Sequence, residues 1–236
     1  MTASSADQRT HPLENSAAAS AGQTQSANTA PYDAPQFHST AGRYPADALS
    51  IPRYFTQAGG DPYAMVRYER RASVIRETDG REVFRMDDVE VPATWSQVAT
   101  DILAQKYFRK TGVPQVDENG EVQRNADGSA VLGSERSIQQ VVHRLAGCWR
   151  HWGEAYGYFA TPADAQAFYD EVAYMLLTQV AAPNSPQWFN TGLHWAYGIE
   201  GTAQGHWYVD PESGELARAK NAYERPQPSA CFIQSV

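Results

Sequence analysis

Two segments in the last quarter of the chain carry residue types that could perform chemistry. Residues 226–233 read Pro-Gln-Pro-Ser-Ala-Cys-Phe-Ile, so Cys231 follows two prolines that prevent a helix, and small neighbours leave its sulfur uncrowded. Residues 182–192 read Ala-Pro-Asn-Ser-Pro-Gln-Trp-Phe-Asn-Thr-Gly, a turn that offers hydroxyl, amide and backbone groups to a polar small molecule. Together they predict a thiol and a polar binding turn, but the residue types alone do not name a reaction.

The other residues that could do chemistry have simpler interpretations. Cys148 lies on an apolar helical stripe, so we interpret it as a small buried hydrophobe. His143 and His151 flank it, but only Cys148 and His151 are one helical turn apart, so we expect no metal site. His194 and His206, which follow the binding turn, are better explained as packing or hydrogen-bonding residues.

Composition argues against several functional classes. The 236 residues are 42% hydrophobic, which suffices for a buried core in one large or two small domains. A formal net charge of -8 argues against a surface that binds a nucleic-acid polymer, since such a surface needs clustered Lys and Arg. No apolar run approaches the roughly 20 residues that span a bilayer, and no basic-then-apolar signal peptide is recognisable. The 2 cysteines fit a reducing compartment, so we expect a cytoplasmic protein without membrane partners.

The chain divides into three parts by composition. Residues 1–42 are rich in Ala, Ser, Thr and Gln and have few large apolar residues, which predicts a disordered low-complexity tail. Residues 43–181 predict a mainly helical domain with short hairpins. Residues 182–236 contain both chemical segments, and strand-like residues on either side of the turn-rich stretch 210–214 predict one more hairpin.

The first elements expected in the central part are a hairpin and a helix. Two short strands are predicted over residues 73–84, around an Asp-Gly turn that tolerates positive φ. A helix is predicted from Thr94, as its N-cap, to near Gly112. One face of this helix carries Trp95, Val98 and Ile102, and Ala99, Leu103 and Tyr107 lie beside them. Its basic end, with Lys106, Arg109 and Lys110, is interpreted as solvated cations that complement the helix dipole. Residues 113–133 predict an exposed loop or weak hairpin.

Two longer helices follow. Apolar residues recur at intervals of three and four over residues 138–159, which predicts a core helix. Thr161 is then followed by Pro162 and by the acid Asp164, the signature of a new helix start, and this second helix must end before Pro183. We expect the two helices to pack antiparallel and to position the turn at residues 182–192.

The two chemical segments resemble those of the adenosylcobalamin-dependent (class II) ribonucleotide reductases. In that family an Asn-Ser-Pro-Gln-Trp-Phe-Asn-Thr-Gly run is followed by a Pro-Gln-Pro-Ser-Ala-Cys-Phe-Ile run. Further matching segments are Asp61-Pro62-Tyr63, Val89-Glu90-Val91-Pro92, Trp95-Ser96-Gln97, Ala104-Gln105-Lys106-Tyr107-Phe108-Arg109 and Gly157-Tyr158-Phe159-Ala160. The resemblance covers roughly residues 43 to 236 and identifies the chain as similar to the N-terminal portion of such an enzyme.

The resemblance implies an α+β fold. A mainly helical N-terminal domain with short hairpins would lead into residues 230–236, the first strand of a ten-stranded α/β barrel that is incomplete here. In the family, the thiyl-forming cysteine, the second redox cysteine and most of the cobalamin and effector surfaces lie further along the chain. We therefore expect this chain to be part of a longer polypeptide, or one half of a gene split by an intein, and to be inactive alone.

The family's chemistry implies roles for three residues. Cobalt–carbon homolysis in adenosylcobalamin leads to a cysteine thiyl radical that takes the 3′ hydrogen of a ribonucleotide, and deoxyribonucleotides for DNA synthesis result. Two other cysteines replace the 2′ hydroxyl and become a disulfide. The match makes Cys231 the first member of this redox pair, with its partner absent, and makes Ser185, Ala230 and Cys231 contacts of the substrate.

The resemblance also implies partners. These are a ribonucleotide, expected to be a diphosphate, a nucleoside triphosphate effector, a thioredoxin or glutaredoxin-like reductant, and the remaining part of the reductase.

Two other functional classes stay open. The segment could be a non-catalytic structural or partner-binding module derived from that enzyme. A thiol-dependent hydrolase or oxidoreductase that uses Cys231 alone is poorly supported, because the chain has no Cys-x-x-Cys and no histidine motif tied to this cysteine.

Overall fold

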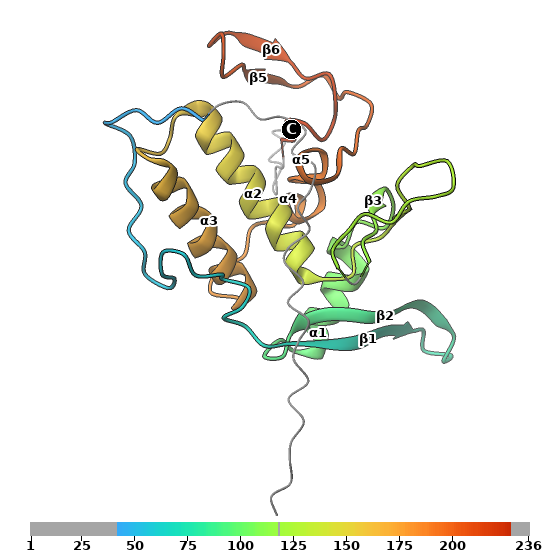
Figure 1. Ribbon diagram of the computed structural model, residues 1–236. Coiled ribbons are helices and arrows are strands. Elements are labelled where there is room, and N and C mark those ends of the chain that lie inside the picture. The colour runs from blue at the N-terminus through green and yellow to red at the C-terminus, as the bar shows by residue number, and fades with distance from the viewer. Residues whose placement is uncertain (1–41, 118, 228–236) are drawn as a thin grey trace, which may run out of the picture.

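A pair of helices lies at the centre of the fold. The structure, a computed structural model, describes residues 42–117 and 119–227. Helix α2 spans Ile138–Tyr156 and helix α3 spans Pro162–Leu177, and the two lie side by side (Figure 1). Because only residues 157–161 connect them, they run antiparallel, as the sequence predicts.

Both helices begin where the sequence places strong start signals. Ser137 caps α2 in a capping box with Gln140, whose side-chain oxygen accepts a hydrogen bond from the Ser137 amide at 3.1 Å. Thr161 caps α3 and accepts from the amide of Asp164. Gly157 ends α2 with a φ of 70°, a left-handed conformation that costs glycine little.

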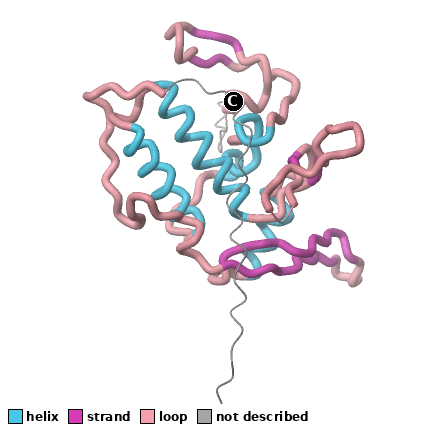
Figure 2. The backbone as a smooth tube through the Cα atoms, in the orientation of Figure 1, coloured by secondary structure: helices cyan, strands magenta, loops and turns pink. Residues whose placement is uncertain are grey.

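Three two-stranded antiparallel sheets surround this pair in the described part of the chain (Figure 2). Strands β1 (Tyr68–Arg76) and β2 (Glu82–Pro92) form the predicted hairpin, which is longer than the sequence pattern indicates. Strands β3 (Val113–Pro114) and β4 (Leu132–Gly133) pair at the base of the predicted loop. Strands β5 (Trp207–Val209) and β6 (Leu216–Arg218) form the second predicted hairpin.

These elements give a mixture of helices and small sheets. Residues 42–117 and 119–227 contain no closed barrel. The predicted barrel strand over residues 230–236 and all but the last residue of the predicted tail, residues 1–42, lie outside the described residues.

The predicted helix from Thr94 to Gly112 is wrong in its start, its length and its buried face. Helix α1 spans Gln97–Ile102 and is capped by Ser96, and it continues as a π-helix, η1, over Leu103–Tyr107. Val98 is 67% exposed and Ile102 is 44% exposed, whereas Leu103 and Ala104 are buried. The cause is Trp95, which precedes the helix and donates its indole N–H to the carbonyl of Leu177 at 2.8 Å. The helical face predicted by counting from Trp95 is therefore rotated away from the face that is buried in the structure.

The basic end of this segment is less solvated than its sequence indicates. The Lys110 ammonium donates a hydrogen bond to the carbonyl of Ala104 and lies 5.0 Å from the centroid of the Phe84 ring. Desolvation of the ammonium lowers the pKa of Lys110. This lysine therefore holds the end of η1 against the β1–β2 hairpin.

The main core lies between the helical pair, the base of the hairpin and η1. It contains Val89, Val91, Leu103, Phe108, Ile138, Val141, Val142, Leu145, Ala173, Leu176, Leu177 and Trp188. A second cluster contains Val113, Leu193, Ala196, Tyr197 and Ile199. As predicted, Cys148 is buried, and its burial raises the pKa of the thiol.

The N-terminal strap, residues 42–61, is tied to α3 by the acidic side chains of Asp164, Asp170 and Glu171. The carboxylate of Glu171 accepts hydrogen bonds from the amide of Phe55 at 2.9 Å, the amide of Thr56 at 2.8 Å and the Thr56 hydroxyl at 2.6 Å. Beside it, Arg53 forms an ion pair with Asp170 at 2.7 Å. Desolvation tends to raise the pKa of Glu171, but the hydrogen bonds outweigh it and hold this pKa below the usual 4.5.

We expect acid to loosen this strap. Since the folded-state pKa of Glu171 is depressed, its stabilising contribution is complete above about pH 4.5 and is lost as the pH falls through the folded-state value. Protection of the Phe55 and Thr56 amides, measured by hydrogen exchange and corrected for intrinsic rates, should fall over that range. In Glu171→Gln the protection should be lower and should not change with pH. An acid response that persists in this variant would contradict the assignment to Glu171.

Candidate functional site

The predicted binding turn at residues 182–192 is a short helix, which corrects the expectation of an irregular turn. Helix α4 spans Ser185–Asn190, and the side-chain oxygen of Asn184 accepts from the amide of Gln187 at 3.2 Å to cap it. Pro186 fits this helix because the first turn needs no amide donor. The Asn-Ser-Pro sequence, interpreted as a turn, is thus a capped helix start.

Ser185 lies at the exposed start of α4, beside the last residue of η1. Its hydroxyl oxygen is 3.2 Å from the phenol oxygen of Tyr107. The Tyr107 ring stacks on Trp188, with centroids 5.4 Å apart and an angle of 15° between planes, and it also contacts Phe189. The structure therefore adds Tyr107, which sequence reasoning did not select, to the surroundings of Ser185.

Beneath this surface a buried ion pair fixes the backbone. The Nε of Arg144 donates to a carboxylate oxygen of Glu135 at 2.7 Å, and both side chains are 0% exposed. The guanidinium also donates to the carbonyls of Trp188 at 2.7 Å, Thr191 at 2.8 Å and Tyr107 at 3.3 Å. Arg144 thus holds the C-terminal half of α4, its C-cap and the end of η1 in one arrangement.

The carboxylate of Glu135 is equally well satisfied. It accepts from the phenol of Tyr197 at 2.8 Å and from the backbone amide of Arg109 at 2.7 Å. Full hydrogen bonding is what makes a buried charge tolerable. A sequence signal for this pair exists, because Arg144 occupies the apolar stripe of α2 between Val141 and Cys148, where a cation needs a buried partner.

Gly192 connects α4 to α5, and its backbone packs directly against the carbonyl of Arg144. Its φ is 81°, and a Cβ there would lie 2.0 Å from the carbonyl oxygen of Arg144. Helix α5, Leu193–Tyr197, follows directly. Only glycine satisfies both the left-handed backbone and this close approach.

Substituting Gly192 with alanine should destabilise the fold by about 2–4 kcal/mol, from left-handed strain and from overpacking. Gly80→Ala is the matched control, because Gly80 has a φ of 86° and nothing within 4 Å of its Cβ position. The control should lose only about 1–2 kcal/mol. Urea denaturation of both variants measures the difference, and equal losses would show that the Arg144 backbone yields to the added methyl group.

The other predicted site residues, Ala230 and Cys231, lie outside the described residues. Their distances from Ser185 and their roles are therefore not tested. Within residues 42–117 and 119–227, Cys148 is the single cysteine, and it is buried.

His143, His151 and His194 have hydrogen-bonding or ring contacts, whereas the buried Nε2 of His206 has no hydrogen-bond partner in the part of the chain that the structure describes. His194 Nδ1 lies 3.1 Å from the side-chain nitrogen of Asn221, and His143 Nδ1 lies 2.8 Å from the phenol oxygen of Tyr169. No cluster of three or more His, Cys, Asp or Glu side chains with metal-binding geometry occurs among the described residues. None of the helices in that part of the chain has the length and apolar character needed to cross a membrane.

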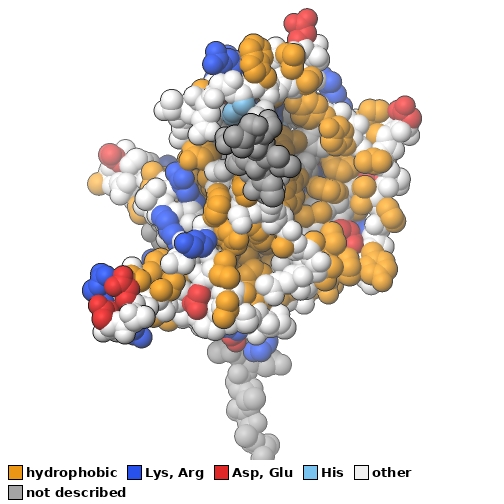
Figure 3. Space-filling view, turned by 180° about the vertical axis from the view of Figure 1, so that it is seen from behind, with side chains coloured by type: hydrophobic (Ala, Val, Ile, Leu, Met, Phe, Trp, Pro, Cys, Tyr) orange, Lys and Arg blue, Asp and Glu red, His pale blue; other side chains and the backbone are white. Residues whose placement is uncertain are grey.

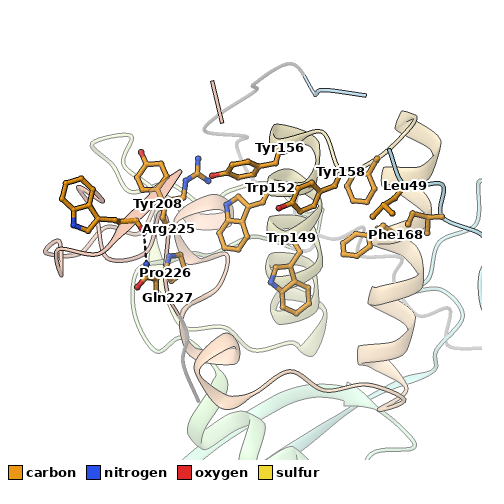
Figure 4. Close-up of a pocket in the computed structure, with 14 residues that line it drawn as sticks. Leu49, Trp149, Trp152, Tyr156, Tyr158, Phe168, Tyr208, Arg225, Pro226 and Gln227 are labelled. Atoms are coloured by element: carbon orange, nitrogen blue, oxygen red, sulfur yellow. Dashed lines mark hydrogen bonds between the residues drawn. The ribbon is translucent and has the colours of Figure 1, made fainter. Parts of the chain in front are cut away.

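A concave feature lies along the C-terminal half of α2, and we call it the aromatic groove. Its volume is about 520 Å³, and it is lined mainly by the rings of Trp149, Trp152, Tyr156, Tyr158, Phe168 and Tyr208 (Figure 4). Hydrophobic side chains also cover much of the molecular face shown in Figure 3. The aromatic groove has few polar groups, so it suits an apolar occupant better than a phosphate.

Comparison with known proteins gives a consistent result. Residues 69–179 match a family described as class II vitamin B12-dependent ribonucleotide reductase. A vitamin B12-dependent ribonucleotide reductase of Agrobacterium fabrum is 54% identical over 204 residues, and one of Bradyrhizobium diazoefficiens is 53% identical over 204 residues. Each alignment covers 80% of this chain and 16% of the relative. One from Rhodopirellula baltica is 40% identical over 178 residues, which are 75% of this chain and 16% of that protein.

Proposed function

Because the chain belongs to the family of class II vitamin B12-dependent ribonucleotide reductases, we propose that it forms the N-terminal part of an enzyme that reduces ribonucleotides to deoxyribonucleotides. The observation that carries the proposal is the identity of 53–54% over 204 residues to proteins of that name. The chain spans only 16% of the length of these relatives, so the activity is proposed for the longer protein.

Ser185 is proposed as a substrate contact, together with the backbone at Ala230 and Cys231. Its exposed position supports this role, because a hydroxyl at the start of α4 is open to a ligand. The buried hydrogen bonds of Arg144 support it too, since they fix the carbonyls of Trp188 within α4 and of Thr191 at its C-cap. A preorganised backbone loses little entropy when a nucleotide binds.

Cys231 is proposed as one of two thiols that supply the reducing equivalents. Oxidation of two thiols to a disulfide releases two electrons and two protons, and these replace the 2′ hydroxyl by hydrogen while the hydroxyl leaves as water. The second thiol belongs to the longer protein, because buried Cys148 has a raised pKa and is a poor nucleophile. A thioredoxin or glutaredoxin-like dithiol would then reduce the disulfide by exchange.

Cobalamin in its adenosyl form would supply the radical for this chemistry when it is bound. The described residues do not fit it as a resident group. The aromatic groove, at about 520 Å³, has the size of a site for a drug-sized ligand, and a corrin with its nucleotide is much larger. We therefore assign cobalamin binding to the longer protein. For the longer protein we also propose a ribonucleoside diphosphate as the substrate and a nucleoside triphosphate as the effector.

The test combines this chain with the remainder of the enzyme, either by co-expression or in one polypeptide. Adenosylcobalamin, a dithiol and a ribonucleoside diphosphate are added, and deoxyribonucleotide is measured. Product should form with the assembled enzyme, and the isolated chain should give none. An assembled, folded enzyme that binds no nucleotide and forms no product would refute the proposal and favour a non-catalytic module.

A further inference from the structure

The phenol of Tyr107 and the hydroxyl of Ser185 meet at the molecular surface, although 78 residues separate them in the chain. Their oxygens are 3.2 Å apart, Ser185 is exposed, and Tyr107 is half-buried. A hydrogen bond between two hydroxyls that water can reach adds little to the stability of a fold, because water is an equally good partner for each group. Stability is therefore a weak explanation of this contact.

Helix η1 directs the Tyr107 ring toward α4. The amide of Phe108 donates to the carbonyl of Leu103 at 3.0 Å, which is the bond of a π-helix. The hydrogen-bonded loop of a π turn contains one more residue than that of an α turn, so the side chains at its end point in a changed direction. Single π turns inside α-helices are rare and occur frequently at functional sites.

Two further contacts hold Tyr107 in this position. The same guanidinium nitrogen of Arg144, Nη2, donates to the carbonyls of Tyr107 at 3.3 Å and of Trp188 at 2.7 Å, so one buried cation fixes η1 relative to α4. The Tyr107 ring also stacks on the Trp188 ring. The phenol oxygen is therefore in place before a ligand arrives, and a preorganised group loses little entropy on binding.

The pair of hydroxyls can donate one hydrogen bond to a ligand. Each hydroxyl carries one proton and can both donate and accept. The bond between the two oxygens uses one of the two protons, whichever residue donates it, so the other proton can go to a third oxygen. A ribonucleotide carries acceptor oxygens on its sugar and phosphate groups. Without the phenol of Tyr107, the O–H of Ser185 would rotate freely and would lose this direction.

We propose that Tyr107 is a positioning residue for the substrate. Its phenol holds the Ser185 hydroxyl in one orientation, and the pair donates one directed hydrogen bond to the ribonucleotide. This inference rests on the proposed role of Ser185 as a substrate contact, and it assigns the orientation of that contact to η1.

The test measures ribonucleotide affinity in the assembled enzyme, with cytidine diphosphate as the probe. Tyr107→Phe removes the phenol oxygen but keeps the ring on Trp188, so urea denaturation should find the stability unchanged. The dissociation constant, measured by equilibrium dialysis, should rise about two- to tenfold, the usual effect of one neutral hydrogen bond. In turnover, KM should rise while kcat stays nearly constant, because the lost interaction is made in both the ground state and the transition state.

A double-mutant cycle shows whether Tyr107 acts through Ser185. Ser185→Ala should raise the dissociation constant at least as much as Tyr107→Phe, and the double variant should bind no more weakly than Ser185→Ala alone. Tyr44→Phe is the matched control, because its phenol donates to Glu154 at 2.8 Å, near the C-terminal end of α2. This control should leave both the dissociation constant and the turnover unchanged.

The possible failures are distinguishable. Unchanged affinity in Tyr107→Phe, with weaker binding in Ser185→Ala, would overturn the positioning role and leave the proposed function intact. Effects that multiply in the double variant would also overturn it, as would a Tyr107→Phe variant that loses stability and affinity together. Normal affinity in Ser185→Ala would remove both the substrate contact and its positioning. Nucleotide binding without product would refute the reductase activity, and the dialysis cycle would still decide the role of Tyr107.

Discussion

Replacing Arg144 with methionine should lower the free energy of unfolding by about 3–5 kcal/mol. The substitution keeps an unbranched apolar side chain of similar length but leaves the carboxylate of Glu135 buried without its cation. It also removes the donors to the carbonyls of Trp188 and Thr191, which lie in the same buried cluster. Urea denaturation measures the loss, and hydrogen exchange of α4 should show its amides losing protection first.

An exposed ion pair supplies the control for this prediction. Arg81 and Glu77 are 63% and 49% exposed at their side chains, so Arg81→Met should change stability by no more than about 1 kcal/mol. Glu135→Gln should cost nearly as much as Arg144→Met, since it leaves the guanidinium uncompensated. The double variant should cost less than the sum, because the two residues act through one interaction. An additive double variant would show that the pair does not work as a unit.

In the assembled enzyme, Cys231→Ser should lower deoxyribonucleotide formation by at least about 10³-fold, because a hydroxyl cannot form the disulfide that supplies two electrons. Binding of the ribonucleotide, measured separately by equilibrium dialysis, should change little. Lost turnover with unchanged ribonucleotide binding shows that the variant lacks the reducing thiol and that its substrate site is intact.

Cys148→Ala is the matched cysteine control. The Cys148 thiol is buried in α2 with a raised pKa, so its removal should cost only stability and should leave turnover near that of the unaltered enzyme. If Cys148→Ala abolished turnover in a folded enzyme while Cys231→Ser did not, the assignment of the redox cysteine would be wrong.

Local signals in the sequence predict the elements that they control directly. The Ser137 and Thr161 caps and the apolar period behind them place α2 and α3 within a few residues. The Asp-Gly turn places the β1–β2 hairpin. These features succeed because each is determined by contacts within one turn or one strand pair.

The misplaced features depend on contacts between distant segments. Trp95 resembles the first residue of a helical face, but its ring is fixed by a carbonyl on α3, 82 residues away. Val98 and Ile102 are consequently exposed, although they have the right period and composition. No local pattern contains the position of Leu177, so the rotation of α1 could not be predicted.

The candidate site was predicted only in part, because it too depends on contacts between distant segments. The sequence selects Ser185 and the segment around it, but it gives no sign that Tyr107 would lie 3.2 Å from that hydroxyl, 78 residues away in the chain. Arg144 and Glu135 were also missed, because the cation on the apolar stripe of α2 indicates a buried acidic partner but does not identify which acidic residue that is. The roles of Ala230 and Cys231 remain predictions from the family resemblance.

The buried Arg144 cluster also sets an order for folding during synthesis. Glu135 lies 9 residues before Arg144, so the first half of the cluster can form as soon as α2 leaves the ribosome. The carbonyls of Trp188 and Thr191 follow 44 and 47 residues later, and Tyr197 lies 62 residues beyond Glu135. Until these later partners are synthesised, the Arg144 guanidinium keeps part of its hydration. The face of α2 that carries Arg144 therefore cannot be buried completely. The nascent chain should therefore gain resistance to protease only after about Tyr197 has emerged, and a ribosome stalled before that point should present a segment that chaperones bind.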